Sequence, residues 1–212
     1  GAEKNYRKWL ETKIDQSIEW GTFEEFMSMR KDLIKQNPAL EYDLGLLRRQ
    51  TIRHHLQPHI KNEIELNALI DEAYEFFLKE RHKVVFYDQV VEVLESLVSR
   101  AMLGVLTNGN ADVNKLGIGH LFEFSISSVD VKSNKPDSAH FIKAKEISGI
   151  EFVNTLHIGD HPINDVKGAR DLGINTMWFN SQNLTWDVDD NPPVVFNHWS
   201  QFMNLLSLHH EQ

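Results

Sequence analysis

Three short segments of the chain carry side chains that could hold an anion or a cation. The segment 107–110, Thr-Asn-Gly-Asn, follows an apolar run and supplies a hydroxyl, amides and a flexible backbone able to turn its N–H groups toward an anion. A lone lysine, Lys135, precedes a proline just ahead of a helical pattern. Asp160 follows another apolar run, and Asp165 comes shortly after it. At this spacing the two carboxylates lie close enough to share a hard divalent cation.

Each segment also has a simpler structural interpretation when it is taken alone. Thr-Asn-Gly after a strand is an ordinary turn sequence, because Asn and Gly are the residues that turns favour. Asp160 could cap a helix, and Asp165 could complement a helix dipole. The order of the three segments along the chain is more specific than any one of them, and it favours a common site.

The elements around these segments predict an α/β fold, a Rossmann-like parallel sheet with helices on both faces. Short apolar strands alternate with helical patterns after residue 84, which is typical of such a sheet. Ligands of parallel sheets bind at the carboxyl ends of the strands. We therefore expect Lys135 to lie close to the Thr107 hydroxyl and to the Asp160 carboxylate. The expected strands cover residues 102–106, 124–126, 155–158 and 175–179, with a late edge strand at 194–196, and the expected helices cover 89–99, 111–116, 138–148 and 162–172, the last ended by Gly173.

The first part of the chain predicts helices only, and we place a helical domain at residues 1–83 and the α/β domain at 84–212. The first helix would carry a stripe of Tyr6, Leu10, Ile14 and Ile18. A capping box at residues 22–25 would open a second helix that ends before Pro38. A third helix is expected over 42–56 and a fourth around residues 66–77. The aromatic residues of these helices, Trp9, Trp20, Phe23, Phe26 and Phe77, are expected mostly in the bundle core.

Composition excludes several classes of protein. The 212 residues are 41% hydrophobic with a formal net charge of −9, which is the wrong sign for a protein that binds nucleic acid or anionic lipid through phosphate contacts. The absence of cysteine excludes disulfides and thiolate sites and is compatible with a reducing compartment. The longest apolar runs are far shorter than the roughly 18 residues of a membrane helix. We expect a cytoplasmic protein, a monomer or weak dimer, with no nucleic-acid or membrane partner.

The ordered motifs resemble those of the haloacid dehalogenase superfamily of phosphohydrolases. Its second, third and fourth motifs look like Thr107-Asn108, Lys135-Pro136, and Gly159-Asp160 through Asp165. The helical segment lies where members with an inserted α-helical cap carry it. Residues 107–111 and 116–124 look like a bacterial branch of small-molecule phosphatases that includes enzymes acting on flavin and ribityl-pyrimidine phosphates.

This resemblance implies hydrolysis of a small phosphorylated metabolite, a phosphate monoester, through an aspartyl-phosphate intermediate. Asp160 would ligate Mg²⁺ directly and Asp165 through water. The Thr107 hydroxyl would donate to a phosphoryl oxygen with the Asn108 amide beside it, and Lys135 would offset the remaining charge.

The family's first motif, a strand ending in Asp-x-Asp-x-Thr with the nucleophile, is absent from the sequence. Residues 187–190 have a passing likeness to it but follow no buried strand. We expect the motif in roughly 15 to 30 further residues upstream, about the length of a strand, its loop and a helix start. Three alternatives remain, namely a non-catalytic binding protein of the same fold, a dehalogenase, which works without the metal, and a phosphonatase, which would use a lysine of the cap.

Overall fold

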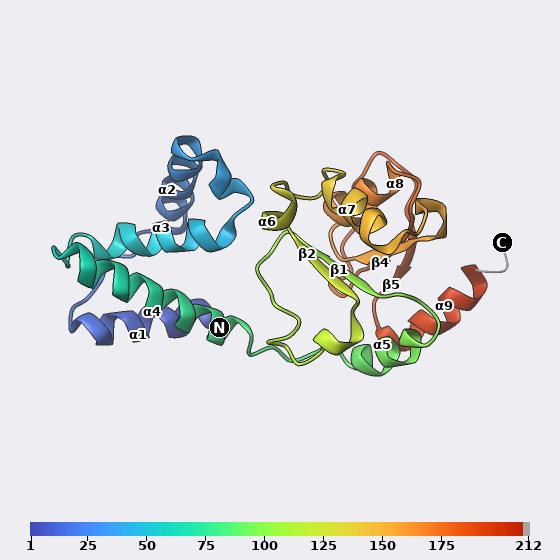
Figure 1. Ribbon diagram of the computed structural model, residues 1–212, viewed down its shortest axis with the longest axis horizontal. Coiled ribbons are helices and arrows are strands. Elements are labelled where there is room, and N and C mark those ends of the chain that lie inside the picture. The colour runs from blue at the N-terminus through green and yellow to red at the C-terminus, as the bar shows by residue number, and fades with distance from the viewer. Residues whose placement is uncertain (210–212) are drawn as a thin grey trace. The chain divides into compact units, whose positions relative to one another are not determined.

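The computed structural model describes residues 1–209, which divide into two units (Figure 1). The helical unit comprises residues 1–84 together with 109–112. The α/β unit comprises residues 85–108 and the described residues from 113 onward. The last three residues of the predicted α/β domain lie outside the described part of the chain.

The helical unit is built from four helices around an apolar core. Tyr6 and Leu10 of the first helix are buried against Leu56 of the third and Phe77 of the fourth. The Phe77 ring meets the Tyr6 ring edge to face, which is the geometry that aromatic pairs prefer. The helices are α1 (Ala2–Ile14), α2 (Phe23–Gln36), α3 (Leu44–Leu56) and α4 (Glu63–Arg81), with a short 3-10 turn, η1 (Pro38–Glu41), after α2.

Polar caps determine where these helices begin. The Thr22 hydroxyl accepts from the Glu25 amide and the Glu25 carboxylate accepts from the Thr22 amide, so the predicted capping box opens α2. Asp43 accepts from the Leu46 amide and starts α3 two residues later than the predicted start at residue 42.

Two expectations about the helical unit are wrong. The first helix ends at Ile14 because Asp15 adopts the left-handed conformation, so Ile18 is buried from a loop and is not part of a helical stripe. Phe23 is 72% exposed, and no residue of α2 is buried. Phe26, Leu33 and Ile34 of α2 are only half-buried.

The α/β unit confirms the predicted class, with parallel strands and intervening helices. β1 pairs with β2 from Gly104 opposite Phe124 to Thr107 opposite Ser127. β4 lies between β3 and β5, also in parallel. The elements are α5 (Val90–Val98), β1 (Gly104–Thr107), β2 (Phe124–Ser127), α6 (Ser128–Val131), α7 (Ala139–Ser148), β3 (Leu156–Gly159), the π-helical turn η4 (Pro162–Lys167), α8 (Gly168–Arg170), β4 (Asn175–Phe179), β5 (Val194–Phe196) and α9 (Phe202–His209).

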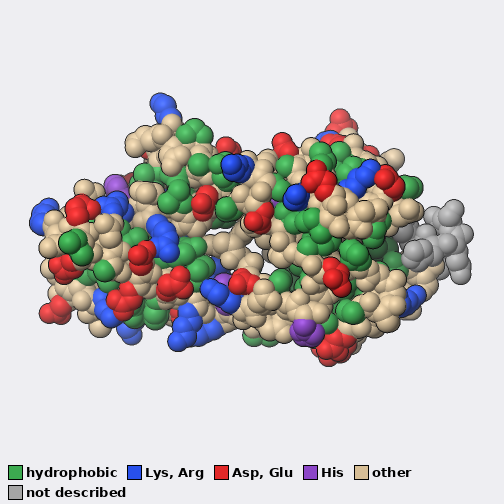
Figure 2. Space-filling model, viewed as in Figure 1, with side chains coloured by type: hydrophobic (Ala, Val, Ile, Leu, Met, Phe, Trp, Pro, Cys, Tyr) green, Lys and Arg blue, Asp and Glu red, His purple; other side chains and the backbone are tan. Residues whose placement is uncertain are grey.

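Apolar side chains form two core clusters in the α/β unit. Met177 and Phe179 of β4 pack with Phe196 and Phe202 in one cluster. Phe141 of α7 packs with Ala169 and Ile174 in another. On the face shown in Figure 2, acidic and basic side chains are interspersed over the surface of each unit. Within the described residues, no helix is both long enough and apolar enough to cross a bilayer.

Two predicted helices of the α/β region differ from the structure. Residues 111–112 have no regular structure and residues 113–117 form turns that end at the left-handed Gly117. The predicted helix over 162–172 is a π-helical turn followed by the short α8. Gly173 has φ +78° and ends this region in the left-handed conformation, as predicted.

Candidate active site

The end of β1 is fixed by two side chains from later elements. The carbonyl oxygen of Thr107 lies 3.2 Å from Nε2 of His140 in α7, and the Ser128 hydroxyl lies 3.5 Å from the same oxygen. A carbonyl can only accept, so this His140 nitrogen carries the proton. Burial lowers the pKa of His140 and keeps its ring neutral.

Asn108 holds the loop that contains Lys135. Its Nδ2 donates to the Lys135 carbonyl at 2.8 Å, and its Oδ1 accepts from the Lys135 amide at 2.7 Å. Ser128 also donates to Asn134 at 2.7 Å. The Asn108 side chain thus pairs with the backbone as a neighbouring strand would, and it fixes where the lysine side chain starts.

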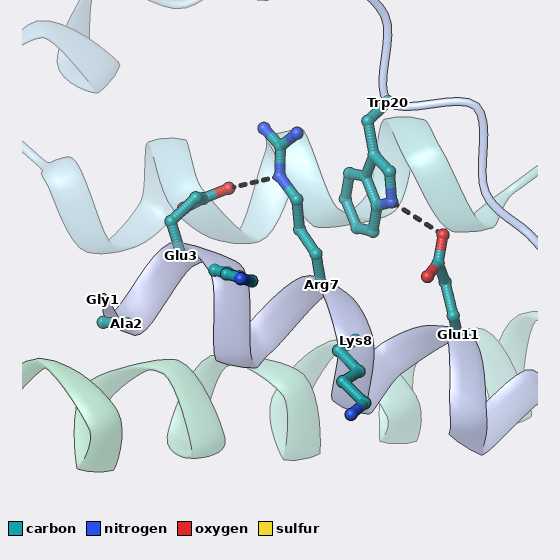
Figure 3. Close-up of a pocket in the computed structure, with 8 residues that line it drawn as sticks. Gly1, Ala2, Glu3, Arg7, Lys8, Glu11 and Trp20 are labelled. Carbon is teal, nitrogen blue, oxygen red and sulfur yellow. Dashed lines mark hydrogen bonds and ion pairs between the residues drawn. The ribbon is translucent and has the colours of Figure 1, made fainter.

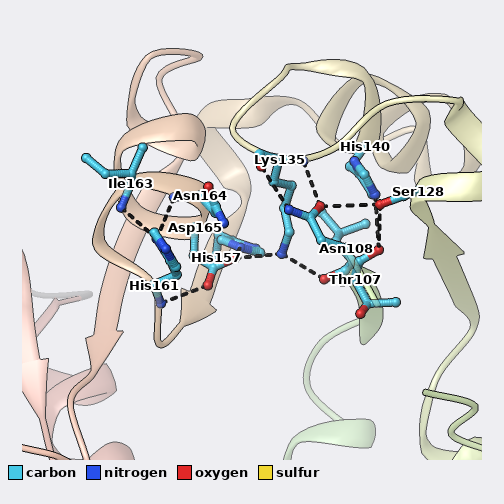
Figure 4. A network of polar contacts seen from close by, with 11 residues as sticks. Thr107, Asn108, Ser128, Lys135, His140, His157, His161, Ile163, Asn164 and Asp165 are labelled. Carbon is cyan, nitrogen blue, oxygen red and sulfur yellow. Dashed lines mark hydrogen bonds and ion pairs between the residues drawn. The ribbon is translucent and has the colours of Figure 1, made fainter. Parts of the chain in front are cut away.

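Lys135 bridges the ends of β1 and β3. Its Nζ donates to the Leu106 carbonyl at 2.8 Å and to Oδ1 of Asp165 at 2.6 Å (Figure 4). Both members of this ion pair are buried, with Lys135 7% and Asp165 6% exposed. An ion pair in such a place is stable only when further hydrogen bonds surround it, and the Leu106 carbonyl is one of them.

Asp165 receives its other contacts from β3 and from η4. The His161 amide donates to Oδ2 at 3.0 Å, and His157 Nε2 lies 3.5 Å from Oδ1. Burial by itself would raise the pKa of the Asp165 carboxyl, but the His157 contact and the Lys135 charge outweigh it and hold the pKa well below its usual range. Asp165 is therefore ionised at neutral pH.

Local backbone structure explains why Asp165 turns back toward β3. Nδ1 of His161 accepts from the amides of Ile163 and Asn164 and caps η4, the turn that carries Asp165. The side chain of Asp165 lies over the Cα of Gly159, where a Cβ would come within 2.3 Å of Asp165 Cβ. Only glycine at the end of β3 leaves room for this carboxylate.

Asp160 takes a different position at the end of the same strand. It is exposed, and its carbonyl accepts from Trp178 Nε1 at 2.9 Å. Its carboxylate makes no hydrogen bond or ion pair with any residue from 1 to 209. Asp160 thus presents a carboxylate that is available to a ligand.

The structure brings the three predicted segments together, with one difference from the expected contacts. Thr107, Asn108, Lys135 and Asp165 join in one network of polar contacts (Figure 4). Lys135, however, pairs with Asp165 and not with Asp160. The reason is the space above Gly159, which admits the Asp165 carboxylate next to the lysine while Asp160 faces outward.

Sequence reasoning missed three members of the network. His140 lies in a segment that is predicted as a helix, and His157 lies in a segment that is predicted as a strand. Ser128 directly follows β2. Of these three residues, only His157 could have been identified from the sequence, because it lies inside the strand that leads to Gly159. The Phe141 ring meets the buried His157 imidazole edge to face.

A divalent cation fits this site in part. Among the described residues, no group of three His, Asp or Glu side chains surrounds a common point. Asp160 offers a free carboxylate, the hard oxygen donor that Mg²⁺ prefers. Oδ1 of Asp165 is occupied by Lys135, whereas Oδ2 accepts only the His161 amide and retains a lone pair that could accept from a metal-bound water.

A groove in the helical unit does not offer comparable chemistry. It has a volume of about 760 Å³ and runs along α1 (Figure 3). Three of its charged side chains already have partners, since Arg7 contacts Glu3 at 3.0 Å and Glu11 accepts from Trp20 at 3.0 Å. The network at the strand ends is the better candidate.

Two curated proteins that resemble this chain are named as phosphatases. YigB, the 5-amino-6-(5-phospho-D-ribitylamino)uracil phosphatase of Escherichia coli, is 27% identical over 168 residues, which are 77% of this chain and 71% of YigB. A phosphoserine phosphatase of Thermus thermophilus is 31% identical over 113 residues, 50% of this chain and 45% of that protein.

A solved structure and a family model extend the likeness over most of the chain. The crystal structure of a 2-haloacid dehalogenase from Pseudomonas syringae has a TM-score of 0.89 and 33% identity, and the match covers 99% of this chain and 90% of that one. The model of the haloacid dehalogenase-like hydrolases matches residues 25–179. With the three motifs joined at the strand ends, these matches show that the chain belongs to the haloacid dehalogenase-like hydrolase family.

Proposed function

We propose that this protein hydrolyses the phosphate monoester of a small metabolite, using Mg²⁺ and an aspartyl-phosphate intermediate. The observation that carries the proposal is the convergence of three strand-end segments on the buried Lys135–Asp165 pair, with the free carboxylate of Asp160 on the same strand end. Two relatives named as phosphatases support it.

The residues of the network can stabilise a phosphoryl group during its transfer. The Lys135 ammonium has three protons, of which two are used by Leu106 and Asp165, so one remains for a phosphoryl oxygen. The Thr107 hydroxyl would donate to a second oxygen. Asn108 would act mainly through the Lys135 backbone that it holds. Such fixed donors lower the barrier because they need no reorganisation as charge develops.

The metal would be held by Asp160 directly and by Asp165 through water. When bound, Mg²⁺ would neutralise charge on the phosphoryl oxygens. A protein carboxylate would attack phosphorus and expel the ester oxygen, and water would then hydrolyse the acyl phosphate and regenerate the carboxylate.

We place the nucleophile on a further parallel strand between β1 and β3. In the described part of the chain, β1 pairs only with β2 and β3 only with β4, so each has an unpaired edge. Unpaired edges expose backbone donors and acceptors that an added strand would satisfy. Lys135 links the end of β1 to Asp165 and thereby to His157 of β3, so an aspartate at the end of such a strand would reach the same network.

The helical unit would act as a cap that selects the substrate. Residues 1–83 would form this cap and residues 84–212 the catalytic domain, in a protein that works as a monomer or weak dimer. The substrate would be a small phosphorylated metabolite.

A dehalogenase is the second candidate, because of the likeness to the 2-haloacid dehalogenase structure. Two observations favour the phosphatase. Asp160 keeps a free carboxylate where a metal could bind, and several curated relatives, among them a pyrimidine 5'-nucleotidase of Streptococcus pneumoniae that is 27% identical, are named for phosphate-ester substrates.

One assay separates the two candidates. The protein, expressed from the start codon of its own gene, is given p-nitrophenyl phosphate or 2-chloropropionate, each with Mg²⁺ and with a chelator. We expect phosphate release that requires Mg²⁺ and no chloride release. Chloride release in chelator without phosphate release would establish the dehalogenase, and no turnover of either compound would support a non-catalytic protein.

A further inference from the structure

Asn108 is the one asparagine of the sequence that is followed by a glycine. In an Asn-Gly pair the backbone nitrogen of the glycine can attack the side-chain carbonyl carbon of the asparagine, because glycine has no Cβ to block the approach. This reaction, deamidation, converts the asparagine into aspartate or isoaspartate. Asn108 directly follows β1 and holds the backbone of Lys135, so deamidation would alter a contact within the candidate active site.

Hydrogen bonds hold both polar atoms of the Asn108 side chain. Nδ2 donates to the Lys135 carbonyl at 2.8 Å, and Oδ1 accepts from the Lys135 amide at 2.7 Å. The Ser128 hydroxyl lies 3.5 Å from the same Oδ1 and donates to Asn134 at 2.7 Å. Asn134 and Lys135 belong to the segment 132–138 between α6 and α7, which we call the 132–138 loop. The Asn108 side chain is thus bound to the loop on both sides of its amide plane edge.

Deamidation needs only base and water. The Gly109 amide loses its proton to a base in the solvent, and its nitrogen forms a bond to Cγ of Asn108. The bond between Cγ and Nδ2 then breaks, and Nδ2 takes protons from the solvent and leaves as ammonia. Water opens the cyclic imide at either of its two carbonyl carbons and leaves aspartate or isoaspartate at position 108.

The folded structure opposes this reaction. Attack makes the planar Cγ tetrahedral and then expels Nδ2, so the hydrogen bonds that hold the planar amide to Lys135 must break first. They can break together when the 132–138 loop moves away. Asn108 is only half-buried, so water reaches its side chain once the loop has moved.

We propose that Asn108 is a deamidation site that reacts when the 132–138 loop detaches, and that the product no longer holds the loop. A carboxylate has no proton to donate to the Lys135 carbonyl, so two acceptor oxygens would face each other where the 2.8 Å hydrogen bond was. Isoaspartate also lengthens the backbone after β1 by one methylene group. The reaction takes place whether or not the protein hydrolyses phosphate esters, so it goes beyond the proposed function.

Reaction rates in the protein and in a free peptide test this gating. Trypsin releases residues 101–115 as one peptide, which contains Asn108, Asn110 and Asn114, and mass spectrometry locates the modified residue. The folded protein and the synthetic peptide 101–115 are incubated at mildly alkaline pH. Asn108 should react faster than its two neighbours in the peptide, and about 5- to 150-fold more slowly in the protein, the factor for two typical hydrogen bonds. Equal rates at Asn108 in protein and peptide would overturn the proposal.

A variant tests whether the loop controls the rate. Ser128→Ala removes the hydrogen bond to Asn134 of the loop and should speed deamidation of Asn108 by about 2- to 10-fold, the factor for one hydrogen bond. Ser96→Ala is the matched control and should leave the rate unchanged, because the Ser96 hydroxyl donates to the Val93 carbonyl at α5. Equal rates in the two variants would contradict control by the loop.

Asn180 shows whether the Ser128→Ala variant has simply unfolded. Its side chain is held in the same way, since Nδ2 donates to the Leu184 carbonyl and Oδ1 accepts from the Leu184 amide. Asn180 precedes a serine and lies outside the 132–138 loop. Its rate should not change in Ser128→Ala. A parallel rise at Asn180 would show general unfolding and would contradict local gating.

Hydrogen exchange tests the effect of the product on the loop. Asn108→Asp places a carboxylate at this position in every molecule, and protein aged at alkaline pH provides the natural product if the variant does not fold. We expect the amides of the 132–138 loop to exchange faster than in fresh protein, while those of β4 keep their protection. Loop exchange as slow as in fresh protein would show that the product still holds the loop and would overturn the proposal.

Discussion

Lys135 and Asp165 depend on each other, because each is buried and each is the other's charged partner. Removing one charge leaves the other without compensation in a site that water barely reaches. Such a loss typically costs about 3–5 kcal/mol, whereas neutralising both partners costs much less. The pair therefore supports the fold of the α/β unit as well as the proposed chemistry.

Lys135→Met should lower the free energy of unfolding by about 3–5 kcal/mol, and the double variant Lys135→Met/Asp165→Asn should regain most of that loss. Urea unfolding, monitored by tryptophan fluorescence, measures the free energy of unfolding of the single and of the double variant. Lys167→Met is the matched control, since its ion pair with Asp171 is exposed and should contribute less than about 1 kcal/mol. A single variant as stable as the control would show that the pair is not buried in solution.

His157 should make stability depend on pH. Burial lowers its pKa below the usual value of about 6.5, so the unfolded chain takes up a proton that the folded protein does not. Stability is then fully present above about pH 6.5 and falls as the pH drops through that value toward the folded pKa. His157→Gln should reduce the slope of unfolding free energy against pH by up to about 1.4 kcal/mol per pH unit in this window. The exposed His120→Gln should leave the slope unchanged.

At the scale of elements, Gly159 leaves room for the Asp165 side chain of η4 at the end of β3, and Gly168 lets α8 approach Pro136. A Cβ at Gly159 would lie within 2.3 Å of Asp165 Cβ, whereas a Cβ at Gly168 would lie 3.0 Å from Pro136 Cα. Gly159→Ala should therefore displace the Asp165 carboxylate and cost about 1–3 kcal/mol or more, and Gly168→Ala should cost less. Thermal unfolding of both variants shows which substitution destabilises the protein more. A larger loss of stability in Gly168→Ala than in Gly159→Ala would contradict the packing described.

The capping box of α2 should act locally. Thr22→Ala should destabilise the start of this helix by about 1 kcal/mol, because the Glu25 amide loses its acceptor. Hydrogen exchange of the α2 amides measures the effect. Thr12→Ala is the control, since the Thr12 hydroxyl only donates to the Lys8 carbonyl within α1. Equal protection of the α2 amides in both variants would show that the cap contributes nothing.

Features that depend on neighbouring residues could be predicted from the sequence. The capping box at Thr22 and the left-handed Gly173 are local, and the structure contains both. The exposure of Phe23 could not be predicted, because a helical pattern shows an apolar face without showing what covers it. The pairing of Lys135 with Asp165 depends on the space over Gly159, which exists only once the strand and the turn have met.

At the scale of the whole molecule, parallel strands bring residues distant in sequence to one edge. The alternation of strands and helices predicts from topology that the segments 107–108, 135–136 and 159–165 meet at one edge, but it did not predict that Lys135 pairs with Asp165 and not with Asp160. The same alternation did not predict that the strands form two separate sheets, β1-β2 and β3-β4-β5.

The most direct test of the account is the Mg²⁺ dependence of phosphate release in the variant Asp160→Asn. Asp160 is exposed and its carboxylate has no partner among the described residues, so the variant should unfold within about 0.5 kcal/mol of the parent protein. We predict that its Mg²⁺-dependent release of phosphate from p-nitrophenyl phosphate falls to background, while the exposed Asp189→Asn keeps full activity. Parental activity and an unchanged Mg²⁺ requirement in Asp160→Asn would contradict the assignment of this strand end as the metal-assisted phosphate site.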